Sequence, residues 1–168
     1  MKKFLKEWGS IIVIAAILAI IINKFVFFNI NVPTGSMLPT IQLKDRIFCT
    51  VVHSQKSIKR GDILVFKSEE LEEKLVKRVI GLPGDHIEFM GDGTVYVNNE
   101  KLDEPYVVNN SDKTGIFDVP ENCYFFAGDN RATSLDARVW QNPYIDYKYI
   151  KGKAQFVILP FNRIGKLK

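Results

Sequence analysis

Hydrophobic residues are distributed in two contrasting ways along the chain. Residues 9–22 form a run without a charged side chain, whereas the rest of the chain alternates short apolar stretches with turn-forming residues. Counted from Trp8 through Phe27, the first segment would give about 30 Å of helix, enough to cross a bilayer. It is apolar on all sides rather than along one stripe, which does not fit a helix packed on a core. We therefore expect residues 1–28 to form a basic tip and a transmembrane anchor.

A removable signal peptide is the main alternative for this segment. The basic start, with Lys2, Lys3 and Lys6, fits that alternative, but no small-x-small cleavage pattern follows the apolar run. An uncleaved anchor is therefore preferred. The positive-inside rule then keeps the lysines in the cytoplasm and places the rest of the chain outside. We expect a single-pass protein of the cell membrane with an extracytoplasmic domain.

The remainder of the chain predicts strands and no convincing helix. Short runs rich in β-branched and aromatic residues are bounded by Gly, Pro, Asn or Asp; they are 25–32, 46–52, 62–66, 75–80, 86–90, 94–97, 124–127 and 152–158. Turns are expected at 91–93 and 98–100. The pattern predicts a mainly β fold, in which the anchor precedes an antiparallel sheet or barrel core. That core would comprise residues 29–84 and 122–168, with residues 85–121 inserted as a small β lobe.

Composition and charge narrow the function classes. The formal net charge of the 168 residues is +4, and no concentrated basic patch favours nucleic acid. Basic residues beside an apolar segment instead favour contact with anionic membrane lipid. The two cysteines, Cys49 and Cys123, permit a disulfide outside the cytoplasm without requiring one. Because the sequence lacks Cys/His clusters at metal-binding spacing, we expect no metal site.

A serine on a stiff turn is the first candidate for chemistry. Ser36 lies in PTGSMLPT (33–40), a few residues beyond the apolar segment. Gly35 would let a substrate backbone approach closely. The Ser36 N–H and the Thr34 hydroxyl would then provide hydrogen-bond donors for a developing oxyanion. Taken alone, the motif also fits an ordinary loop.

Serine needs a base to become a nucleophile, and a lysine is the best candidate. The only two histidines of the sequence, His53 and His86, lack a companion aspartate in a recognisable arrangement. Lys77 lies in LVKRVI (75–80), where strand alternation gives it an apolar face and directs Arg78 to the other face. Burial there would lower the lysine pKa and favour the neutral amine. An exposed lysine on an edge strand is the ordinary alternative.

A third polar segment, GDNRATSLDAR (128–138), follows the apolar run 124–127. Ser134 is a candidate to hydrogen-bond the amine of Lys77 and orient it. Four charged residues are candidates for ion pairs that hold the segment in place: Arg78, Asp129, Asp136 and Arg138. A purely structural cluster of Asx turns is the alternative, and it is compatible with a supporting role.

Together these segments resemble the type I signal peptidases, in the single-anchor form typical of Gram-positive bacteria. The resemblance rests on the anchor and on PTGSMLPT (33–40), GDILVF (61–66), KRVIGLPGD (77–85), GDNR (128–131) and PFNRIG (160–165). Each motif is weak alone, but the ordered set covers nearly the whole chain and is highly specific.

The resemblance implies a membrane-anchored serine endopeptidase that cleaves N-terminal signal peptides from exported preproteins at Ala-x-Ala sites, without a cofactor. It implies that Ser36 is the nucleophile, Lys77 the general base, Thr34 a member of the oxyanion hole and Ser134 the contact that orients the lysine. The structural charges of the family would be Arg78, Asp129, Asp136 and Arg138. Its partners would be preprotein signal peptides and membrane lipid, with the secretion machinery or pilins as further candidates and nucleic acid excluded.

Two departures from the family pattern motivate alternatives. Ala137 stands where serine is common, and Gln141-Asn142 replaces a glycine near Trp140. One alternative is a specialised relative that serves a dedicated client, such as pilus assembly, with low or no general cleavage activity. Others are a self-cleaving Ser–Lys repressor-type protease and a non-enzymatic β domain. The sequence leaves open the client range, the oligomeric state, the pKa of Lys77 and the pairing of the cysteines.

Overall fold

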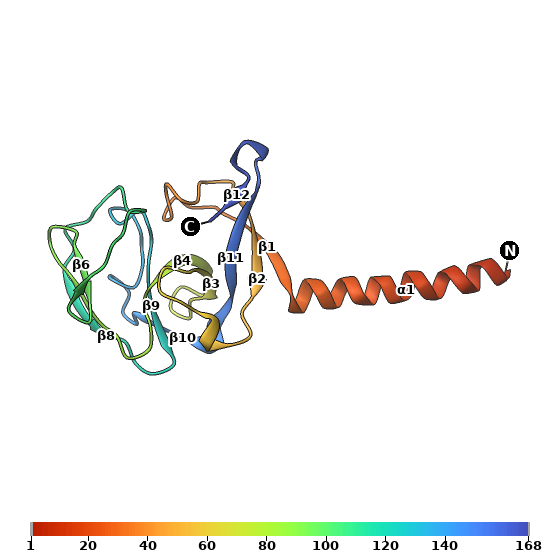
Figure 1. The fold of residues 1–168 in the computed structure, drawn as a ribbon, viewed down its shortest axis with the longest axis horizontal. Helices are drawn as coiled ribbons and strands as arrows, with labels where there is room; N and C mark the ends of the chain where they lie inside the picture. Colours follow the sequence, from red (N-terminus) through yellow and green to blue (C-terminus); the bar gives the residue numbers. More distant parts are fainter. Residues whose placement is uncertain (1, 168) are drawn as a thin grey trace.

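A long helix leads into the first strand and projects from the β-rich remainder of the chain (Figure 1). The computed structural model describes residues 2–167, and the helix, α1, runs from Lys2 to Phe25. The side chains of the predicted basic tip, residues 2–7, lie outside those that the structure describes. The apolar segment is thus helical. Within residues 2–167, however, no helix reaches both the length and the hydropathy required of a membrane span, so the predicted transmembrane helix is not found there.

The main sheet contains eight of the described strands, and every pairing in it is antiparallel. Its order is β1 (Phe27–Asn31), β2 (Arg46–Val51), β11 (Ile150–Leu159), β3 (Ile63–Lys67), β4 (Lys74–Gly81), β9 (Cys123–Ala127) and β10 (Tyr144–Asp146), with β12 (Gly165–Lys166) paired to β11. Three short 3₁₀ turns complete the described part, namely η1 (Gln55–Ser57), η2 (Tyr147–Tyr149) and η3 (Phe161–Arg163). The prediction of a mainly β, antiparallel fold is confirmed.

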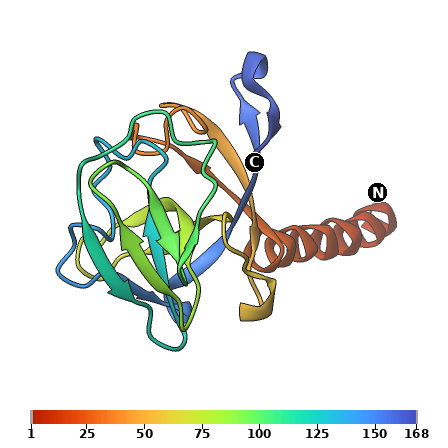
Figure 2. The same ribbon diagram turned by 60° about the vertical axis from the view of Figure 1, so that its left-hand side comes forward.

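A second sheet lies beside the main one and is formed by residues between β4 and β9 (Figures 1 and 2). Its order is β7 (Glu100–Lys101), β6 (Val95–Val97), β5 (His86–Phe89) and β8 (Gly115–Asp118). The β6–β7 turn holds Asn98 at φ 53° and Asn99 at φ 66°. Asparagine tolerates this left-handed conformation better than most residues, which explains why the turn forms there.

The main sheet is packed with apolar side chains on both faces. Along β3, Ile63 and Val65 join one cluster, whereas Leu64 and Phe66 join the other. All four side chains are buried, as expected for a central strand covered on both faces. The first cluster also contains Met37. The residue next to Ser36 is therefore fixed in the core.

Some local predictions differ from the structure. The expected strand 25–32 begins only at Phe27 because α1 continues to Phe25. Strands β8, β10 and β12 were not predicted, because each has only two to four residues and polar or turn-forming residues lie in or beside it. Cys49 and Cys123 are free thiols, the first buried and the second half-buried.

Candidate active site

The Ser36 loop, residues 32–45, connects β1 and β2, and its own apolar side chains anchor it in the core. Met37 and Ile41 are both buried in the core. Two backbone hydrogen bonds shape the turn, from Leu38 N to the Gly35 carbonyl (3.2 Å) and from Ile41 N to the Met37 carbonyl (2.9 Å). Ser36 itself is half-buried. These contacts hold a hydroxyl at a surface-accessible position on a rigid loop.

Lys77, on β4, lies directly beside that hydroxyl. Its Nζ atom is 2.5 Å from Oγ of Ser36, and the residue is only 3% exposed. Burial lowers the pKa of Lys77 from 10.5 to about 8, against the opposing effect of the Asp136 carboxylate and with help from the Arg138 guanidinium. A lysine with such a pKa is partly neutral near pH 8. In that state its amine can accept the proton of Ser36.

Ser36 and Lys77 open onto one cavity of about 250 Å³. Its walls are mainly apolar and come from β1, β3 and β4; they include Ile30, Val32, Val65, Leu75 and Val76. Thr34 lines the same cavity and is exposed to solvent. A second hollow shares Ile30, Val65 and Lys74 with it, so the two form a continuous apolar depression along β1.

The 128–138 loop grips the Ser36 loop through Asp129 and Asn130. The carboxylate of Asp129 accepts two hydrogen bonds from Arg78 (2.8 and 2.6 Å) and one from the Thr40 hydroxyl (2.5 Å). Asn130 donates from its backbone N–H to the Ser36 carbonyl (3.1 Å) and from Nδ2 to the Gly35 carbonyl (3.2 Å). Arg78 is therefore buried and paired on the far side of β4.

A second ion pair, Arg138 with Asp136, closes the same loop. The guanidinium donates from Nε (2.8 Å) and Nη2 (3.0 Å), and the Gly128 N–H also donates to Asp136 (2.9 Å). Burial alone would raise the pKa of Asp136, but the Arg138 guanidinium and the Gly128 N–H outweigh it and hold this pKa below its usual range. Asp136 is thus a fixed negative charge, and it opposes the lowering of the Lys77 pKa by burial.

Ser134 is placed next to the site, but no contact with the lysine amine is seen. Its hydroxyl is buried and lies close enough to the Asp136 carboxylate to lower the pKa of Asp136 as a hydrogen-bond donor. A Cβ atom built on Gly128 would lie 2.3 Å from Ser134 Oγ and 2.4 Å from the Ser36 carbonyl oxygen. The two serines therefore approach each other across a position that only glycine can occupy.

Several supporting residues were missed by the sequence analysis. Thr40 and Asn130 lie within the motifs PTGSMLPT and GDNR, but nothing in the sequence shows that each bonds to a residue of the other motif. Arg163 donates two hydrogen bonds of 3.0 Å to the fully buried Asp45, and a longer one (3.4 Å) to the Thr40 carbonyl. The C-terminal motif PFNRIG thereby braces the Ser36 loop. Among the described residues, no cluster of three or more potential metal ligands occurs.

Comparisons with known proteins agree along nearly the whole chain. Residues 5–159 match the model of the family described as signal peptidase, peptidase S26. Signal peptidase I S of Bacillus subtilis (strain 168) is 38% identical over 98% of this chain and 95% of its own length. Signal peptidase I of Bacillus licheniformis is 41% identical over 98% and 94%, respectively. The crystal structure of a signal peptidase I from Enterococcus faecalis V583 aligns with a TM-score of 0.50 and 32% identity, covering 60% of this chain and 98% of that one.

Proposed function

The chain belongs to the signal peptidase family, peptidase S26, and on that premise we propose that Ser36 and Lys77 form its catalytic dyad. The family consists of serine endopeptidases, and its signal peptidase I members release signal peptides from preproteins. The observation that carries the proposal is the 2.5 Å between Nζ of Lys77 and Oγ of Ser36, in a site that makes the amine easy to deprotonate.

The proposed reaction needs only these two side chains and water. Neutral Lys77 takes the hydroxyl proton while Ser36 Oγ attacks the carbonyl carbon of the scissile bond. The tetrahedral intermediate collapses, the C–N bond breaks, and the protonated lysine gives its proton to the departing amine of the mature protein. Lys77, neutral again, then deprotonates a water molecule that attacks the acyl-enzyme. When the bond between the acyl carbon and Ser36 Oγ breaks, Lys77 returns that proton to Ser36 Oγ, which restores both side chains.

Thr34 is proposed as a donor to the oxyanion, together with the Ser36 N–H. Both residues line the cavity that holds the reacting hydroxyl. Because Thr34 is exposed, its hydroxyl can turn toward an oxygen bound at the mouth of that cavity. Ser134 is proposed to orient Lys77, since its hydroxyl lies beside Gly128 and the Ser36 backbone. Charge that develops during the attack would be stabilised by these fixed donors.

The substrate is proposed to bind as an extended strand between β1 and the first half of β4. Among the described strands, β1 pairs only with β2, and the β4–β9 pairing starts at Arg78. Backbone hydrogen-bonding groups therefore remain available on both sides of the cavity. Alternate side chains of a bound strand point to one face. The cavity of about 250 Å³ has room for two small side chains from alternate positions of a bound strand, which is compatible with Ala-x-Ala sites.

We further propose that α1 anchors the enzyme in the cell membrane, with its N-terminus in the cytoplasm and the β body outside. The uncharged run 9–22 and the lysines before it support this orientation. Described side chains of α1, including Trp8, Ile12 and Ile20, are more than half exposed. Ser36 follows the end of α1 closely in sequence, so substrate emerging from the same membrane would reach it. Lipid would then be a partner besides the preprotein.

The two departures from the family pattern do not favour a specialised client. Ala137 is fully buried, and Gln141 and Asn142 donate their backbone N–H groups to Glu70. None of these three lines the cavity at Ser36. Both departures therefore lie outside the proposed substrate site.

A cleavage assay on the full chain in detergent tests the proposal. Wild type should process a preprotein with an Ala-x-Ala site, while Ser36→Ala and Lys77→Ala should each lose roughly three or more orders of magnitude in rate. Lys56→Ala removes an exposed lysine on η1 and should cleave normally. Residual activity of Ser36→Ala near the wild-type rate would rule out the dyad. A wild type that ignores generic preproteins would favour the specialised alternative.

A further inference from the structure

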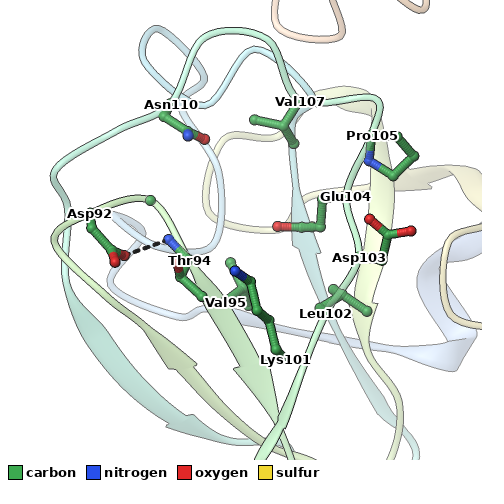
Figure 3. A pocket seen from close by; sticks show the side chains of 11 residues that line it. Asp92, Thr94, Val95, Lys101, Leu102, Asp103, Glu104, Pro105, Val107 and Asn110 are labelled. Carbon is green, nitrogen blue, oxygen red and sulfur yellow. Dashed lines mark hydrogen bonds between the residues drawn. The ribbon is translucent and has the colours of Figure 1, made fainter.

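A short segment of the small lobe, residues 104–106, contacts the 128–138 loop. Glu104 follows β7, and its side chain is only 8% exposed. In Figure 3 it points away from its exposed neighbour Asp103, which lies on the other side of the segment. Glu104 forms a two-pronged ion pair with Arg131, whose Nη1 lies 2.9 Å from Oε2 and whose Nη2 contacts Oε1. The Glu104 carboxylate therefore binds the 128–138 loop, which supports the proposed active site.

Arg131 also contacts other residues of the 128–138 loop. Its Nε donates to the Gly128 carbonyl (3.0 Å), and its own carbonyl accepts from Nη2 of Arg138 (2.8 Å). Arg138 in turn holds Asp136. The residue that Glu104 holds thus connects the Gly128 turn, which lies against Ser36, with the ion pair near Lys77.

Tyr106 connects the same lobe segment to the other ion pair. Its hydroxyl donates to Oε1 of Glu104 (2.8 Å), and burial together with the Glu104 charge raises its pKa, so it stays protonated. The Arg78 guanidinium lies 3.8 Å from the centre of its ring, an arrangement typical of a cation–π contact. Arg78 is the partner of Asp129. One segment therefore contacts both arginine–aspartate networks.

Backbone contacts keep the two segments in register. Ala132 N donates to the Asn109 carbonyl (3.0 Å), and the Asn109 side chain donates to Asn130 (3.3 Å).

A buried ion pair such as Glu104 with Arg131 is weak support for stability because desolvation offsets its attraction. Its fixed two-pronged geometry suits positioning instead.

We propose that Glu104 and Tyr106 are positioning residues that hold the 128–138 loop against Ser36 and Lys77. The inference rests on the proposed roles of that serine and lysine. Neither Glu104 nor Tyr106 lines the substrate cavity, so both act through Arg131 and Arg78. The inserted lobe is then a working part of the enzyme.

The decisive comparison is Glu104→Gln against Glu100→Gln, an exposed glutamate of the same lobe. Glu104→Gln should lower kcat roughly tenfold or more with KM changed by less than about twofold, because substrate contacts remain intact. The midpoint of the rise of kcat/KM with pH should also lie at a higher pH than in wild type. The reason is that a loosened loop would readmit water to Lys77 and raise the pKa of its amine. Glu100→Gln should match wild type in every respect.

Tyr106→Phe and Tyr106→Leu separate the two contacts of the tyrosine and provide a second route if Glu104→Gln folds poorly. Phenylalanine keeps the ring under Arg78 and loses the hydroxyl, so its loss of kcat should be smaller than that of leucine. Unchanged kcat and pH dependence in Glu104→Gln, or in Tyr106→Leu if the former does not fold, would overturn the proposal. So would a lower melting temperature as the only effect. Inactivity of wild type itself would instead reject the proposed function.

Discussion

The surroundings of Lys77 as a whole make its ammonium group easier to deprotonate. Burial is the largest influence on its pKa; Asp136 and Asp129 oppose it, and Arg138 assists it. Both carboxylates are engaged by arginines, so much of their attraction for an ammonium is cancelled. A low-dielectric site that contains two aspartates can therefore still favour a neutral amine. The arginine–aspartate pairing therefore matters to the proposed reaction, because it keeps the pKa of Lys77 low.

This burial should cost stability, in a way that depends on pH. The folded pKa of Lys77 is about 8 and its ordinary value is 10.5, so between these pH values the unfolded chain binds a proton that the folded chain does not. Stability therefore rises with pH across this window. Below it, the penalty is on the order of 3 kcal/mol.

Lys77→Met should accordingly be more stable than wild type at pH 7, and the difference should shrink toward pH 10. Denaturant unfolding of both proteins, followed by the fluorescence of the largely buried Trp140, measures it. Lys56→Met, at an exposed position, is the matched control and should show no such trend. Equal destabilisation by Lys77→Met at both pH values would show that Lys77 is not held against its charge.

The pairing of Ser36 with Lys77 could be predicted from the sequence, but the contacts that support this proposed dyad could not. Ser36 stands out on a Gly/Pro turn, and Lys77 stands out in an apolar strand. Alternation correctly separated Lys77 from Arg78, yet gave no sign that Arg78 would be as deeply buried as the lysine. Its partner Asp129 is 51 residues away, and such pairings depend on tertiary structure.

At the scale of elements, the site depends on how two loops meet. The Ser36 loop and the 128–138 loop approach so closely at Gly128 that a methyl group would overlap Ser134 Oγ and the Ser36 carbonyl. The Gly128 N–H is also held by Asp136. Neither neighbouring backbone can move away without disturbing Ser36.

Gly128→Ala is therefore expected to reduce activity about a hundredfold or more, because a shift of the Ser36 loop by even 1 Å misplaces the nucleophile. It should also destabilise the fold by about 1–3 kcal/mol through overpacking. The control is Gly91→Ala, where the nearest atom to an added Cβ lies at 3.5 Å. Rate assays and thermal unfolding measure both effects. Wild-type kcat in Gly128→Ala would mean that the loops do not need this contact.

Strands of the main sheet were predicted where the alternation was long enough to read. The runs 46–52, 62–66, 75–80 and 152–158 correspond to β2, β3, β4 and β11. β8, within the lobe, and β10 were missed because each is a short apolar stretch flanked by polar and turn-forming residues. Their formation depends on pairing with β5 and β9, which is information held by the fold rather than by the segment.

At the scale of the whole molecule, distant parts of the chain converge on the Ser36 loop and on the 128–138 loop beside it. Arg163 near the C-terminus holds Asp45, 118 residues earlier, and Glu104 of the inserted lobe holds Arg131 of the catalytic loop. The sequence motifs mark these regions but do not reveal their contacts. The order of the motifs identified the family, whereas the three-dimensional arrangement shows how the C-terminal segment and the small lobe contact the loops of the proposed active site.

The pH dependence of kcat/KM for the full chain, measured on a preprotein substrate in detergent, tests the central claim most directly. If a buried, neutral Lys77 is the base, the rate should rise with pH along a single limb whose midpoint lies near 8. The midpoint should disappear with the activity in Lys77→Ala. A profile that is flat through this range, or one whose midpoint stays at the ordinary lysine value of 10.5, would contradict the account.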